Sequence, residues 1–132
     1  MTAKNDVACS PAPSPTPAAY ACPQHSRADR IRALNDHLRT TGQGGRVQIT
    51  RGIVELGPDF AHAVLARVIG FDAFTEDNDP FGEHDCASLK VMDQNILWKI
   101  DYYDRSLTFN SPDPTDPKVT VRVLTIMLAS EY

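Results

Sequence analysis

The chain has 132 residues, and both its prolines and its charges are distributed unevenly along it. Residues 26–67 carry seven Lys/Arg and four Asp/Glu, whereas residues 68–132 carry five Lys/Arg and twelve Asp/Glu. The charges of these two segments, +3 and −7, sum to the net charge of −4. This balance argues against a protein that coats nucleic acid, and no apolar run approaches the roughly 20 residues of a membrane span. The N-terminus also lacks the apolar stretch of a secretory signal, so we expect a cytoplasmic protein.

The first 25 residues contain five of the 10 prolines and no glycine. Proline alternates there with small residues, which offer too little apolar surface to offset the entropy of an ordered chain. We therefore predict a disordered leader over residues 1–25 and a single folded domain over residues 26–132. Cys9 and Cys22 fall in the leader, and Cys86 stands alone without a CxxC pair. We accordingly expect no disulfide, no metal site and no cofactor.

Two helices are predicted from capping signals and apolar spacing. Ser26 and Asp29 resemble a capping box, and Gly42 is a natural C-terminal stop, which together predict a helix over about residues 27–41. Gly57 and a proline in the first turn open a second predicted helix that ends at Gly70. The apolar positions of the two helices are Ile31, Leu34 and Leu38 in the first and Phe60, Val64, Leu65, Val68 and Ile69 in the second.

Alternating apolar residues predict strands in the remainder of the domain. Residues 47–49 form a short predicted strand, and residues 87–91 and 96–102 form a predicted hairpin across a short polar connection. Leu107 and Phe109 suggest a third strand of the same meander. For the residues after Pro117 we predict a final helix, although their many β-branched side chains would also suit a strand.

These elements predict an α+β domain in which a small antiparallel sheet of three to four strands is packed by about three helices. The consecutive strands after residue 84 favour this arrangement. A loose βαβ unit over residues 46–92 is an alternative that the pattern leaves open.

Several segments of residues 30–132 carry a resemblance to a known family. They are residues 30–36, 44–47, 49–52, 78–85, 98–104 and 122–129. On these segments the chain resembles a bacterial family known as domain of unknown function 3768, whose members occur mainly in alphaproteobacteria and often on plasmids. The resemblance implies an association with mobile elements but no activity and no catalytic residue. Where the family usually continues His-Asp-Phe-Gly, this chain has His84-Asp85-Cys86-Ala87, which puts a shared mechanistic role for that pair in doubt.

The densest group of chemically reactive side chains lies in residues 76–85, which hold five carboxylates and one imidazole but no lysine or arginine. Such a group can bind a hard cation, but Phe81 occupies a position where a calcium loop needs an oxygen ligand, and Ser88 stands where such a loop needs a bidentate glutamate. It therefore does not match an EF-hand.

Glu83, His84 and Asp85 are candidate catalytic residues, with Asp101 and Asp104 on or beside the neighbouring strand. A carboxylate beside an imidazole can produce a general acid or base, as a small hydrolase or nuclease would need. The structural alternative, which we favour, is that the segment builds a turn and that His84 bonds an aspartate where a strand begins.

A basic face and an aromatic face are weaker candidates for nucleic-acid binding. Six arginines between residues 27 and 51 could form the basic face of a regulator, but interrupting aspartates favour a solvated helix surface. Trp98 shares its register with apolar neighbours and is expected in the core, whereas Tyr103 lies on the other face of the strand. The arginines are Arg27, Arg30, Arg32, Arg39, Arg46 and Arg51.

The hypothesis that we favour is a small acidic accessory protein of mobile elements that binds a protein partner without catalysis. An inhibitor of the anti-restriction or anti-CRISPR type is its specific form, because acidic proteins can mimic nucleic-acid charge. A hydrolase or nuclease and a nucleic-acid-binding regulator are the alternatives. The candidate binding residues are Asp77, Asp79, Glu83, Asp85, Asp101, Tyr103 and Asp104.

Overall fold

The computed structural model describes residues 26–132, so the leader predicted for residues 1–25 lies outside the described part of the chain. A compact unit covers Ile31–Tyr132. The elements in chain order are α1 (Arg27–Thr41), β1 (Arg46–Ile49), α2 (Arg51–Glu55), α3 (Pro58–Ile69), β2 (Cys86–Val91), β3 (Gln94–Tyr103), β4 (Val121–Leu128) and the 3-10 helix η2 (Ala129–Glu131).

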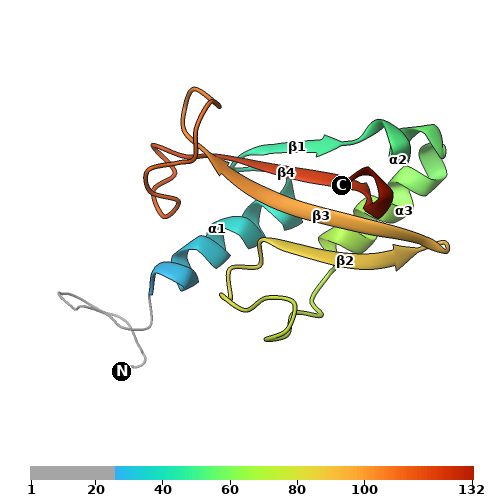
Figure 1. Ribbon diagram of the computed structural model, residues 1–132, viewed down its shortest axis with the longest axis horizontal. Coiled ribbons are helices and arrows are strands. Elements are labelled where there is room, and N and C mark those ends of the chain that lie inside the picture. Colours follow the sequence, from blue (N-terminus) through green and yellow to red (C-terminus); the bar gives the residue numbers. More distant parts are fainter. Residues whose placement is uncertain (1–25) are drawn as a thin grey trace. The chain divides into compact units, whose positions relative to one another are not determined.

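The strands form one four-stranded sheet in the order β1-β4-β3-β2. β4 pairs in parallel with β1 and antiparallel with β3, and β3 pairs antiparallel with β2. The sheet is therefore mixed but mostly antiparallel, and the prediction of an α+β fold with three helices is confirmed. Figure 1 shows α1 and α3 behind one face of the sheet, while the other face is turned to the viewer.

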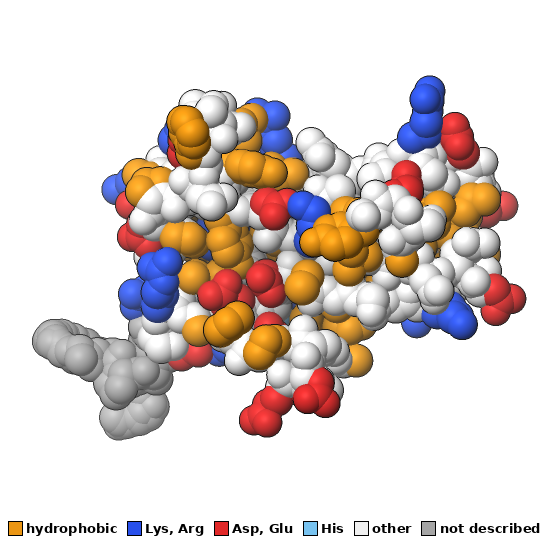
Figure 2. Space-filling model, viewed as in Figure 1, with side chains coloured by type: hydrophobic (Ala, Val, Ile, Leu, Met, Phe, Trp, Pro, Cys, Tyr) orange, Lys and Arg blue, Asp and Glu red, His pale blue; other side chains and the backbone are white. Residues whose placement is uncertain are grey.

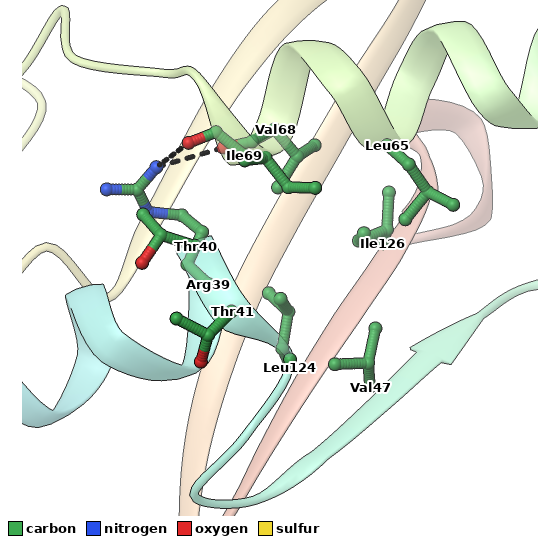
Figure 3. A pocket seen from close by; sticks show the side chains of 10 residues that line it. Arg39, Thr40, Thr41, Val47, Leu65, Val68, Ile69, Leu124 and Ile126 are labelled. Atoms are coloured by element: carbon green, nitrogen blue, oxygen red, sulfur yellow. Dashed lines mark hydrogen bonds between the residues drawn. The ribbon is translucent and has the colours of Figure 1, made fainter.

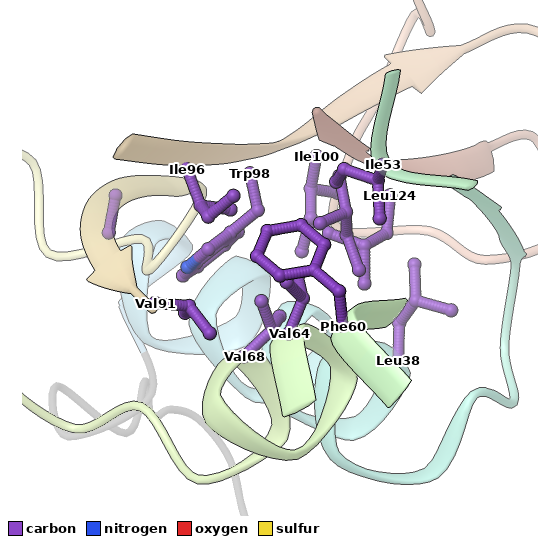
Figure 4. Packing of buried hydrophobic residues seen from close by; sticks show 12 residues of the cluster. Leu38, Ile53, Phe60, Val64, Val68, Val91, Ile96, Trp98, Ile100 and Leu124 are labelled. Atoms are coloured by element: carbon purple, nitrogen blue, oxygen red, sulfur yellow. The ribbon is translucent and has the colours of Figure 1, made fainter. Parts of the chain in front are cut away.

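The core lies between the sheet and the helices, as the alternation of apolar residues in β3 predicts. Ile96, Trp98 and Ile100 point from β3 toward the helices, and Trp98 is fully buried. Figure 4 shows Phe60 and Val64 of α3 packed against this face of the sheet. Burying large apolar side chains on one face of a sheet contributes roughly 1.5–3 kcal/mol for each of them. This packing explains why the expectation of a core position for Trp98 is confirmed.

The hairpin between β2 and β3 is confirmed, and its turn consists of Met92 and Asp93. Both residues have positive φ angles, 49° and 66°. Two consecutive left-handed residues are the signature of the tight turn whose twist matches that of the flanking strands. The turn sets the register in which Ala87 faces Trp98.

The predicted helix after Pro117 is wrong, because the chain forms β4 there. β4 lies between β1 and β3, and most of its residues are buried on both faces of the sheet. Its β-branched side chains fit this central, largely buried strand position better than a helix. The suggested strand at Leu107 and Phe109 is also wrong: Leu107 has a φ of 61°, and the only pairing there is an isolated bridge between Tyr103 and Asn110.

The short helices α2 and η2 are not predicted from the sequence, and the Glu131 side chain connects them. Glu131 in η2 accepts hydrogen bonds from the Thr50 hydroxyl at 2.6 Å and the Gly52 amide at 3.1 Å. The carboxylate thus caps the N-terminus of α2, where the helix amides lack partners. The hydrogen bond with Thr50 holds the pKa of Glu131 below its usual range.

Candidate functional site

A polar stripe on α1 holds the loop that contains the candidate catalytic residues. The Arg32 guanidinium donates to the carbonyl of Gly82 at 2.8 Å, and the Asn35 amide donates to the carbonyl of Glu83 at 2.9 Å. One helical turn after Arg32, the Asp36 carboxylate forms a hydrogen bond with the imidazole ring of His84, the loop residue that follows Glu83. Side chains three and four residues apart share one helix face. Consecutive loop residues are therefore held by consecutive positions of a single helical stripe.

His84 has contacts on both ring nitrogens and on one ring face. Nδ1 lies 2.8 Å from a carboxylate oxygen of Asp36, and Nε2 lies 3.6 Å from one of Asp79. The ring is stacked on Phe74, with centroids 3.7 Å apart and planes 5° apart. The backbone of His84 has a φ of 54°, a left-handed conformation that few non-glycine residues adopt. These contacts make His84 a structural link between α1 and the loop.

Glu83 belongs to a second polar network, which it forms with side chains of α1, β3 and β4. The Tyr102 hydroxyl donates to a carboxylate oxygen of Glu83 at 2.9 Å and accepts from the Asn35 amide at 2.8 Å. Arg122, only 2% exposed, donates from Nε to the Asn35 side-chain oxygen at 2.8 Å and lies over the Tyr102 ring. Burial raises the pKa of Tyr102, so its hydroxyl stays protonated and remains a donor.

Asp85 completes the predicted trio but faces a different environment from His84. Its carbonyl accepts a hydrogen bond from the Ile100 amide at 2.7 Å, which continues the pairing of β2 with β3. Burial raises the pKa of Asp85, and the nearby carboxylates of Glu83 and Asp79 raise it further. No side-chain bond is described between Asp85 and His84. The Asp85 carboxylate therefore does not orient the imidazole; Asp36 does, a residue outside the predicted set.

Asp101, Tyr103 and Asp104 lie apart from this cluster. Asp101 and Tyr103 alternate with Tyr102 along β3, so they occupy the opposite, outer face of the sheet. Both line a shallow hollow of about 270 Å³ there, and Asp101 forms an ion pair with Lys99. Asp104 accepts bonds from the Ser106 hydroxyl and nearby backbone amides and so shapes its own loop. The structure therefore does not bring Asp101 or Asp104 into one site with His84.

The acidic loop, defined as residues 72–85, exposes some of its carboxylates and buries others. Glu76 and Asp77 are exposed, whereas Asp79 is 8% exposed and faces His84. Phe81, two residues after Asp79, is 77% exposed. Figure 2 shows acidic side chains gathered at the lower edge of this view, over the loop. Single exposed apolar side chains are common on protein surfaces, so the carboxylates of the same loop and its fixed backbone are what make Phe81 a candidate contact.

Arg39 changes the interpretation of the arginine-rich helix. Its guanidinium is almost fully buried and donates to the carbonyls of Val68, Ile69 and Phe71 at 2.9–3.1 Å. Helix C-termini leave carbonyls without partners, and a cation there is favourable. Arg39 thus caps α3 and belongs neither to a basic nucleic-acid face nor to a solvated one. The sequence carried one usable signal, because residues 32, 35, 36 and 39 repeat at helical spacing beside the apolar stripe.

The described residues hold neither a metal-binding cluster nor a membrane-spanning helix. Among residues 26–132, no group of three or more His, Cys, Asp and Glu side chains is arranged to hold a metal ion. Within the same range, none of the helices combines the length and apolar character that crossing a membrane requires. The His84 imidazole is already engaged by the carboxylates of Asp36 and Asp79, so the observed contacts position the loop.

Comparisons with known proteins place the chain in a family. Neither the curated proteins nor the solved structures contain a match. A family model described as "Protein of unknown function (DUF3768)" matches residues 49–131, which is most of the chain and covers β2, β3, β4 and the acidic loop but only the last residue of β1. The expected resemblance is confirmed over this range, and the first helix precedes it. The chain belongs to the DUF3768 family.

Proposed function

We propose that this protein is a non-catalytic protein-interaction module whose contact surface is the acidic loop. The observation that carries the proposal is the way α1 holds this loop: Arg32 and Asn35 bond its backbone, and Asp36 bonds His84. The loop is thereby fixed with Phe81 exposed at its surface. A loop that is ordered before binding loses less conformational entropy when a partner docks.

Internal bonds within the loop support the same conclusion. The Asn78 side chain accepts from the Thr75 amide at 2.7 Å and donates to the Ala73 carbonyl at 2.9 Å. The Asp79 amide bonds the Thr75 carbonyl at 2.8 Å. These bonds close a turn just before Phe81, so the aromatic ring is presented from a defined backbone.

The chemistry of the loop describes the partner. Phe81 suits an apolar pocket, since buried aromatic anchors supply much of the energy of protein interfaces. Glu76 and Asp77 suit basic side chains at the rim of that pocket, where charges steer association and set specificity. A partner that normally binds nucleic acid has such a basic surface. Inhibition of a defence enzyme, of the anti-restriction or anti-CRISPR type, is the specific form of the proposal, in keeping with an accessory role on mobile elements.

Affinity capture from a bacterial host with active restriction tests this function. The full chain serves as bait, beside a Phe81→Ala variant and a matched Phe109→Ala variant, because Phe109 is 71% exposed on a different loop. We expect one partner to be recovered by the wild-type and Phe109→Ala chains and lost with Phe81→Ala. We also expect the wild-type chain to lower restriction of incoming DNA.

Two results would contradict the proposal. One is recovery of no partner together with unchanged restriction in cells that express the chain. The other is a partner retained equally by the wild-type and Phe81→Ala chains, which would place the contact outside the acidic loop. Thermal unfolding of each variant confirms that the altered baits are folded, since both replaced side chains are exposed.

A further inference from the structure

The edge of the sheet at β1 is open and has a hollow on each face. Among the described residues, no strand pairs with β1 on the side away from β4. Arg46, Val47 and Gln48 are exposed. Half of the N–H and C=O groups of an edge strand point away from its neighbour and are available to pair with another extended chain.

The hollow on the helix side is apolar. It has a volume of about 150 Å³ and lies between β1, β4, α3 and the C-terminal end of α1. Figure 3 shows Val47 and Leu124 on the sheet side and Val68 and Ile69 on the α3 side. Val47 is 40% exposed and Ile69 is 47% exposed, so the hollow opens at the β1 edge. An aliphatic cavity of about this size holds a benzene-sized group.

The hollow on the outer face of the sheet is more polar. Arg46 and Gln48 of β1 line it, together with Lys99 and Asp101 of β3. Lys99 and Asp101 form an ion pair with each other, which leaves Arg46 as the cation of this hollow nearest the free edge. Side chains of a strand alternate between the two faces of a sheet. A strand added to β1 would therefore place alternate residues over the apolar and the polar hollow.

The charged residues near the free edge of β1 indicate which kind of peptide strand is complementary to it. Arg46 begins β1, and Arg51, two residues after the end of β1, begins α2 with its side chain 88% exposed. Its ion pair with Glu55 is a surface pair at 3.5 Å, which contributes little and is easily exchanged. Glu131 is already engaged by Thr50 and Gly52. Both ends of the edge thus carry a cation that can attract a carboxylate.

We propose that the free edge of β1 binds an extended peptide segment of a partner protein in which aliphatic and acidic side chains alternate. The segment adds a strand beside β1, puts an aliphatic side chain into the apolar hollow and pairs its carboxylates with Arg46 and Arg51. Strand addition of this kind draws its affinity from main-chain bonds and its specificity from the alternate side chains. The surface is separate from the acidic loop, so the inference goes beyond the function proposed above.

The test uses the full chain and a short labelled peptide of alternating valine and glutamate. Fluorescence anisotropy measures its dissociation constant, and amide hydrogen exchange locates it. We expect the peptide to slow exchange at β1 and not at β2. Arg46→Glu should weaken binding about fivefold or more, because it reverses a rim charge. Val47→Asp should weaken it about tenfold or more, because it puts a charge at the mouth of the apolar hollow.

Matched controls separate this site from general charge effects. Lys90→Glu makes the same kind of charge reversal on β2, the opposite edge strand, and should change the dissociation constant less than twofold. A peptide with lysine in place of glutamate should bind at least about tenfold more weakly. Three results would overturn the proposal. The first is absence of peptide binding, and the second is an equal change of the dissociation constant in Arg46→Glu and Lys90→Glu. The third is protection of the β1 amides from hydrogen exchange that rises with protein concentration in the absence of peptide, which would assign the edge to a second copy of this chain.

Discussion

At the scale of single residues, His84 shows how a reactive side chain can serve structure. Its ring lies between the carboxylates of Asp36 and Asp79 and against the face of Phe74. A general base needs a nitrogen within reach of the proton that it abstracts. In this arrangement both nitrogens face aspartates, and the imidazole connects a helix to a loop.

His84→Ala should lower the free energy of unfolding by about 1–3 kcal/mol, because it removes the partner of the nearly buried Asp79 carboxylate and of Asp36. Denaturant unfolding measures this change. His62→Ala, at an exposed position on α3, is the matched control and should stay within about 0.5 kcal/mol of wild type. Loss of a measurable activity in His84→Ala with stability unchanged would instead support catalysis.

Asn35 holds the second network together and makes the next prediction. It accepts from Arg122 and donates to both Tyr102 and the Glu83 carbonyl. Asn35→Ala would leave the buried guanidinium of Arg122 without this acceptor, and should destabilise the fold by about 2–3 kcal/mol. A double-mutant cycle with Tyr102→Phe measures the coupling. Additive effects of the two changes would contradict a shared network.

The residues of this site were only partly predictable. The sequence singled out Glu83 and His84, because carboxylates and an imidazole are dense there. The helical spacing of Asn35 and Asp36 marks a polar stripe on α1, but it does not identify the loop as the partner of that stripe, since nearly fifty residues separate the helix from the loop in the chain. For Arg39 the sequence predicts a solvated helix surface, because aspartates interrupt the row of arginines. Its burial depends on the end of α3 lying against it, which is a long-range contact.

At the scale of elements, Glu131 joins the start of α2 to the end of β4. Its carboxylate caps α2 and bonds the Leu128 amide at the end of β4. Because folding lowers the pKa of Glu131, its contribution to stability is complete above the ordinary value of 4.5 and is lost as the pH falls through the lower folded value.

Glu131→Gln should therefore lower the melting temperature at neutral pH, and the difference from wild type should shrink well below pH 4.5. Thermal unfolding monitored by circular dichroism at both pH values makes the measurement. Glu55→Gln, an exposed carboxylate on α2 itself, is the matched control and should have little effect. A difference that stays constant with pH would show that the cap does not depend on the charge.

The elements themselves differ in how far the sequence determines them. α1 and α3 have caps, stops and apolar stripes that agree, and only two residues, Met92 and Asp93, connect β2 and β3. The segment that becomes β4 carries conflicting signals, because its β-branched residues follow a proline that suits a helix start. Its position between β1 and β3 resolves the conflict, and no local pattern reveals that position. The parallel pairing with β1 was equally beyond local reasoning.

At the scale of the whole domain, the acidic half of the chain does not form one continuous surface. Asp79 and Glu83 are engaged inside the polar networks, Asp101 lies on the outer face of the sheet, and Glu76 and Asp77 remain on the acidic loop. The net charge of −4 is therefore a poor guide to the contact surface. The exposed carboxylates of the acidic loop are the part of it that the proposed contact uses.

The affinity of the captured partner for the wild-type chain and for Phe81→Ala is the most direct test of the account. Calorimetric titration should give at least about tenfold weaker binding for Phe81→Ala, since a truncated aromatic anchor costs more than 1.4 kcal/mol. The affinity of Phe109→Ala should equal that of the wild type. Equal affinities of Phe81→Ala and wild type, with both chains folded, would contradict a contact surface on the acidic loop.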